Sequence, residues 1–134
     1  IGVPDPHHPL SHHGNDPDKI AEFNIVGREH VNRFGQFVRQ LKERKDTEGR
    51  SLLDTTAILY GSGMGNANTH NNSNLPVLVT GGSFRHGSHH AIKRNNPSGS
   101  APLLGDLFLT LMQSMGLEEN RFVNASRNLN ELLL

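Results

Sequence analysis

Apolar side chains recur at helical spacing through the first third of the chain. Between residues 20 and 41 they return at intervals of three, four and seven positions, which is the pattern of one face of an α-helix. Asp16 is a good N-cap, Pro17 suits the first helical position, and a basic turn closes the apolar stretch. The pattern predicts one long amphipathic helix over residues 17–45.

Two short apolar runs come next, and each ends at glycine. They cover residues 56–60 and 75–80 and are separated by a stretch rich in glycine and asparagine. Short, nearly continuous apolar runs are typical of buried parallel strands. We therefore expect two strands and a Gly/Asn loop within residues 56–82, and a last helix over residues 102–116. This order predicts an α/β fold with a partial, mainly parallel sheet and flanking helices.

The predicted elements do not complete a sheet by themselves. A helix of this length spans about 42 Å at ~1.5 Å per residue, more than two strands cover, and parallel strands need both faces buried. Residues 1–134 are thus expected to be a single domain or the C-terminal fragment of a larger α/β domain. The remainder would come from a missing N-terminal portion or a partner chain, and the first residue, Ile1, fits that expectation.

Composition excludes several classes of protein. The 13 basic and 13 acidic residues give a net charge of zero, without the positive surface expected of a nucleic-acid-binding protein. No apolar run approaches the ~18 residues of a transmembrane segment. The chain has no cysteine, which excludes a disulfide scaffold and a cysteine-ligated metal site.

Histidine carries the densest chemical signal. Nine histidines occur, and four of them fall in residues 1–16, a proline-rich stretch that we expect to be a loop. Neutral imidazole is the commonest metal ligand in proteins, and short histidine-rich tracts indicate metal binding. Pro9 favours an extended conformation at His8, so His8 and His12 are not expected to stack on one helix. The alternative interpretation is a solvated histidine-rich loop.

Other candidate residues lie after the predicted strands and around the tract. In open α/β sheets ligands bind beyond the carboxyl ends of strands, which favours a binding role for residues that follow the predicted strands. The alternative interpretations are a plain glycine- and asparagine-rich turn after the first strand and an exposed flap around residues 85–90. His30 falls on the apolar face of the long helix, where burial is expected. The candidates are His70 as a further metal ligand, Ser62, Asn66, Arg85 and His86 for substrate binding, and Asp5 and Asp16 as residues that orient the ligands.

Several motifs, in order, resemble a bacterial family of unknown function named HXXSHH after its motif. Residues 8–13 read HPLSHH, and a long helix, the sequence LYGSGMG over 59–65, His70 and the sequence TGG over 80–82 follow. The resemblance covers nearly the whole chain and implies the C-terminal portion of a longer protein. It also implies a periplasmic or secreted location, because many members carry an export signal.

That family is distantly similar to the alkaline phosphatase and sulfatase superfamily, in which Asp and His side chains hold two divalent metals. The resemblance implies a metal-dependent hydrolase of phosphate or sulfate esters, whose nucleophile lies in the missing portion. An Asp-His pair of the superfamily falls near Ser62 and Gly63, where this chain has neither ligand. The implied metal ligands are His8, His12, His13 and His70, with zinc as the candidate ion. The alternatives are a non-catalytic subunit or interaction module of a larger assembly, and metal storage through the nine histidines.

Overall fold

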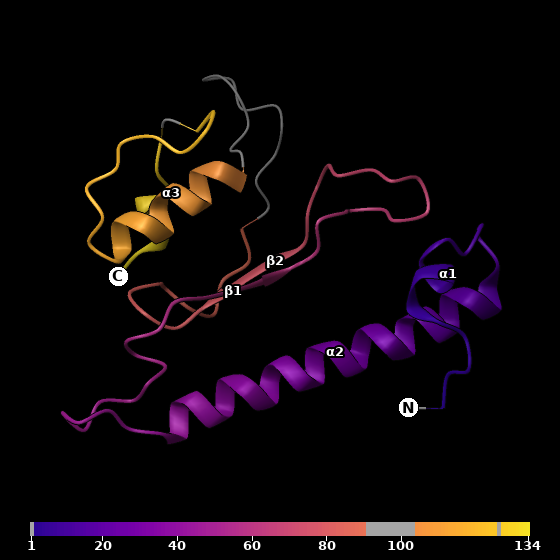
Figure 1. Ribbon diagram of the computed structural model, residues 1–134, viewed down its shortest axis with the longest axis horizontal. Coiled ribbons are helices and arrows are strands. Elements are labelled where there is room, and N and C mark those ends of the chain that lie inside the picture. Colours follow the sequence, from indigo (N-terminus) through magenta and orange to yellow (C-terminus); the bar gives the residue numbers. More distant parts are fainter. Residues whose placement is uncertain (1, 91–103, 126) are drawn as a thin grey trace. The chain divides into compact units, whose positions relative to one another are not determined.

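A computed structural model describes residues 2–90, 104–125 and 127–134 of the chain (Figure 1). The fold is mixed α/β. No helix in these three described ranges is long and apolar enough to cross a membrane. The chain divides into two compact units, which are described separately: unit 1 is Ile1–Leu53 with Leu59–Val79, and unit 2 is Asp54–Ile58 with Thr80–Leu134.

The long helix of unit 1, α2, spans Pro17–Glu43. Asp16 caps it, because its carboxylate accepts hydrogen bonds from the backbone N–H groups of Asp18 and Lys19 at 2.9 and 3.3 Å. These bonds satisfy two of the donors that a helix start leaves without a partner. The helix runs two residues shorter than predicted, and it continues through both of its glycines.

Ser51 caps the C-terminal end of α2, a contact that the sequence pattern does not predict. The Ser51 hydroxyl lies 3.2 Å from the carbonyl oxygen of Leu41 and 3.0 Å from that of Lys42. Ser51 is buried and forms an isolated antiparallel bridge with Lys45. The last carbonyls of a helix have no partner within it, and here the returning chain supplies one.

The histidine-rich segment is not the loop that the sequence predicted, because it contains a short helix, α1 (His7–Ser11). Pro9 lies in the first turn of α1, where a backbone N–H has no intrahelical partner, so proline costs nothing there. Leu10 and Ser11 are the buried residues of this helix. α1 packs against α2 in unit 1 (Figure 1).

The two strands, β1 (Ile58–Gly61) and β2 (Val77–Thr80), pair antiparallel, which corrects the predicted parallel sheet. Ser62 donates to the Pro76 carbonyl at 3.2 Å. At the other end, a Cβ on Gly82 would lie 3.3 Å from that of Ala57. Parallel pairing needs a crossover, usually a helix, whereas residues 62–76 form a hairpin connection without one. Short apolar runs alone do not reveal strand direction.

Among the residues that the structure describes, most of the buried side chains belong to unit 2. Its helix α3 (Leu104–Ser114) lies within the predicted range 102–116, of which residues 102 and 103 fall outside the described residues. The chain ends in a single 3-10 turn, η1 (Asn130–Leu132), and Leu134 donates to the Ser83 carbonyl at 2.8 Å. The buried apolar residues of this unit are Phe84, Leu107, Leu109, Ala125 and Leu129.

Candidate functional site

Three imidazole rings lie side by side in unit 1. The ring centroids of His8 and His12 are 4.8 Å apart, and those of His12 and His70 are 4.7 Å apart. His8 lies in α1, His12 is its C-cap, and His70 belongs to the connection between β1 and β2. We call these three residues the histidine row. The fold thus brings together two of the predicted metal-ligating segments, which lie 58 positions apart in the chain. His8 is helical and not extended as expected, whereas His12 lies outside the helix and the two rings are not stacked, as expected.

Contacts between α1 and α2 fix the position of α1, and with it the positions of His8 and His12. The buried Ser11 hydroxyl donates to the His8 carbonyl at 2.8 Å. The His7 ring lies 5.4 Å from that of Phe23 and 5.6 Å from that of His30, both on α2. His30 is exposed, contrary to the burial expected from the helical pattern, although its ring lies beside that of His7.

The row favours uncharged imidazole at its centre. Desolvation lowers the pKa of His12 below its ordinary value of 6.5, and the neighbouring charges of His70 and His8 lower it further. Each effect penalises the protonated ring. Neutral imidazole is also the form that binds metal ions, so the lowered pKa of His12 favours the metal-binding form of that ring.

The three side chains are suitable metal ligands by residue type, but their geometry suits a metal ion less well. Three imidazoles suit zinc and related ions. The rings, however, meet edge to face, with interplanar angles of 76° and 61°. Within residues 2–90, 104–125 and 127–134, no group of three or more His, Cys, Asp or Glu side chains is arranged to hold an ion. The three imidazoles are therefore ligands of a suitable type for a metal ion, but their present arrangement does not hold one.

The remaining metal-site candidates have other partners or lie apart. The Nδ1 atom of His13 accepts from the Asn15 backbone N–H at 3.0 Å, so in this conformation His13 does not extend the row. Asp16 caps α2 rather than orienting an imidazole in the row. Asp5 is exposed ahead of α1.

Three of the four candidates for substrate binding make hydrogen bonds within the chain. Ser62 accepts from the Met64 N–H at 3.2 Å, and the Asn66 side chain accepts from the Thr69 N–H at 3.3 Å. In unit 2, Arg85 donates to the Leu133 carbonyl at 2.6 Å, while His86 is exposed. These contacts shape turns and fasten the C-terminal segment.

Asn68 is a contributor to the site that sequence reasoning missed. Its side-chain oxygen accepts a hydrogen bond from the Gly14 backbone N–H at 2.9 Å. Gly14 lies two residues after His12, and Asn68 lies two residues before His70. Asn68 is one of several asparagines in its loop, and no sequence signal separates it from the others.

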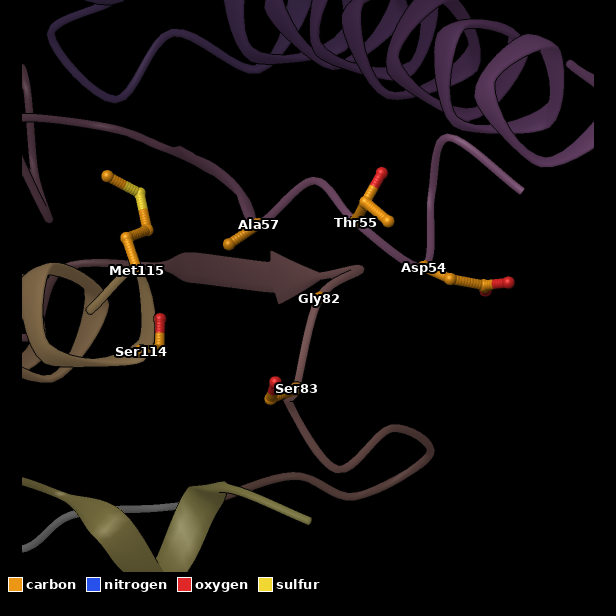
Figure 2. Close-up of a pocket in the computed structure, with 7 residues that line it drawn as sticks. All are labelled: Asp54, Thr55, Ala57, Gly82, Ser83, Ser114 and Met115. Atoms are coloured by element: carbon orange, nitrogen blue, oxygen red, sulfur yellow. The ribbon is translucent and has the colours of Figure 1, made fainter. Parts of the chain in front are cut away.

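Unit 2 contains a shallow pocket of about 330 Å³ (Figure 2). Hydroxyl groups dominate its polar lining, and the Ser114 hydroxyl already donates to the Leu111 carbonyl at 2.8 Å. Asp54 points away from the side chains of Ser114 and Met115 (Figure 2). The lining residues are Asp54, Thr55, Ala57, Gly82, Ser83, Ser114 and Met115.

Comparison with known proteins does not add a family to these observations. No protein family, curated protein or solved structure matches this chain. The HXXSHH resemblance therefore stays a prediction that rests on the residues that carry it.

Proposed function

We propose that this chain contributes a divalent-metal site, formed by the histidine row, to a hydrolase of phosphate or sulfate esters. One observation carries the proposal: His70 lies against His12, although the two residues are far apart in the chain. His8, His12 and His70 would hold the ion, with zinc as the candidate, after their rings turn out of the edge-to-face packing. The chemistry that a bound divalent ion supplies at such a site is polarisation of an ester oxygen and activation of a nucleophile.

The ester class, the location and the missing catalytic group rest on the HXXSHH resemblance. On this proposal the chain is the C-terminal portion of an alkaline-phosphatase-like protein that is periplasmic or secreted. Its nucleophile comes from an N-terminal portion or a partner chain. Ser11 is not that nucleophile, because it is buried and its hydroxyl binds the His8 carbonyl.

The test is metal content and affinity of the purified chain, measured by elemental analysis and by titration with Co²⁺ as a spectroscopic probe. We expect one ion per chain in the wild type, and its loss in His12→Ala and in His70→Ala. His86→Ala is the matched control, because His86 is an exposed histidine of unit 2. Occupancy should fall between about pH 7 and pH 5, where protons compete for imidazole.

Three results would contradict the proposal: no binding, equal loss in the control variant, or occupancy unchanged at pH 5. More than two ions per chain would instead support metal storage. After a positive result, hydrolysis of 4-nitrophenyl phosphate and sulfate by a protein that includes the missing portion tests the substrate class.

A second candidate function is that of a non-catalytic interaction module in a larger assembly. Large apolar side chains on α2 remain substantially exposed: 44% for Ile25, 51% for Val31 and 49% for Phe37. Exposed apolar side chains mark interaction sites only when they are contiguous, and these three lie six positions apart, about 120° from one another around the axis of α2, so they support this function only weakly. Sedimentation of the chain at increasing concentration distinguishes self-association from a monomer. A metal-free chain that forms a stable complex would favour this function over the hydrolase.

A further inference from the structure

The turn that carries His70 is closed by its own hydrogen bonds. Asn66 and Asn71 form an isolated antiparallel bridge, with N···O distances of 3.1 and 2.9 Å between their backbones. Inside this bridge the His70 N–H donates to the Ala67 carbonyl at 3.3 Å. Residues 66–71 therefore behave as one local unit, in which the positions of Asn68 and His70 are coupled.

A single side chain ties this turn to the segment that carries His12. Asn68 is half-buried, and its Oδ1 atom accepts from the Gly14 N–H at 2.9 Å, 54 positions away in the chain. The donor lies two residues beyond one imidazole of the row, and the acceptor lies two residues before another. A hydrogen bond is directional, so this contact sets how the two segments meet, whereas ring packing alone permits sliding.

The backbone on both sides of this contact has a positive φ, which is common for Gly14 and uncommon for His70. His70 has φ +52° and Gly14 has φ +59°. For a residue other than glycine the left-handed region is sterically unfavourable, and such residues persist where their surroundings fix them. At His70 this conformation turns the chain at the point where its ring meets that of His12.

We propose that Asn68 is a positioning residue: its side-chain carbonyl holds the 66–71 turn against Gly14 and thereby places His70 beside His12. Only the expected effect on metal binding rests on the proposed function. The placement of the two rings is a property of the metal-free chain and is measurable there.

The test compares Asn68→Ala with Asn72→Ala, which removes an exposed asparagine of the same connection. The first readout is the nuclear Overhauser effect between ring protons of His12 and His70, whose centroids lie 4.7 Å apart. We expect this signal in the wild type and in Asn72→Ala, and its loss in Asn68→Ala. Asn68→Asp keeps an acceptor oxygen at the same place and should keep the signal.

The second readout is Co²⁺ affinity, which should fall by about 10–100-fold in Asn68→Ala, the range found when groups that orient metal ligands are removed. Unchanged amide signals of α2 and α3 in the variant would show that only the turn has moved. A ring-to-ring signal that persists in Asn68→Ala, or that is missing in the wild type, overturns the positioning role. A signal that depends on Asn68 in a chain that binds no Co²⁺ leaves the positioning role intact and overturns the proposed function.

Discussion

Thr110 in unit 2 and Asn68 in unit 1 perform the same task in different surroundings. Each side chain accepts a hydrogen bond from a distant backbone N–H: Thr110 from Leu129 at 2.7 Å, and Asn68 from Gly14 at 2.9 Å. Thr110 is fully buried, and its hydroxyl also donates to the Asp106 carbonyl at 2.8 Å. Asn68 lies in an exposed turn, where water replaces a lost partner.

Thr110 therefore stabilises the fold of its unit, whereas we expect Asn68 to set the positions of the histidine rings. A buried N–H left without a partner costs the desolvation of that group, about 1–3 kcal/mol, whereas an exposed one is solvated again. We therefore expect substitutions in the core of unit 2 to unfold it, and substitutions around the histidine row to move its rings with little loss of stability. The predictions that follow test this division.

Leu109→Ala should have the largest effect on stability. Leu109 is 1% exposed, and replacing a buried leucine by alanine costs about 2–5 kcal/mol through lost burial and the cavity left behind. Urea unfolding followed by circular dichroism measures the change. Leu117→Ala is the matched control, because Leu117 is 48% exposed and should change the free energy of unfolding by less than about 0.5 kcal/mol. Equal effects of the two variants would contradict the proposed core.

Thr110→Val should destabilise unit 2 by about 1–3 kcal/mol, because the shape is kept while the buried Leu129 N–H loses its acceptor. Thr110→Ser is the control that keeps the hydroxyl and removes only a methyl group. Amide hydrogen exchange at Leu129 gives a local measurement, and it should accelerate in the valine variant more than in the serine variant. The reverse order would mean that packing, and not the hydrogen bond, fixes this contact.

His70→Ala should raise the pKa of His12 towards 6.5, because the charge of His70 is one of the causes that lower it. Desolvation and His8 remain, so the recovery is partial. Titration of the imidazole signals by NMR measures it, with His86→Ala as the unaffected control. Since the folded chain holds the lower pKa, His12 has no effect on folding above about pH 6.5, where the ring is neutral in both states, and opposes folding as the pH falls below that value. A His12 pKa that does not respond to His70 would argue against the row.

Arg50→Ala should produce the smallest effect, at the loop that follows α2. Burial alone would raise the pKa of Asp46, but hydrogen bonds from the side chain and backbone of Arg50 and from the Glu48 N–H lower it below 3.8. Removing the guanidinium should raise this pKa, which an NMR titration of the carboxyl group measures. The contribution of Asp46 to stability is present above its unfolded pKa and is lost as the pH falls through the folded value. Arg33→Ala, which breaks an exposed pair on α2, should leave Asp46 unchanged.

The site could be predicted only in part from the sequence. His8, His12 and His70 were named from the tract and from the loop after the first strand, and the structure places these three side by side. His13 was named with them but turns to the Asn15 N–H. Asn68 was not named, because an asparagine that accepts one backbone hydrogen bond looks like any other asparagine in a polar loop.

Local signals alone determined α2, its cap at Asp16 and the positions of the two strands, because spacing, capping and glycine placement act within a few residues. The tertiary structure decided whatever depends on distant segments. It set the antiparallel direction of β1 and β2, it made helical a segment whose prolines suggested a loop, and it brought His70 to His12. Strand direction and ring contacts between remote loops depend on how the chain returns to itself, and no single stretch of sequence records that path.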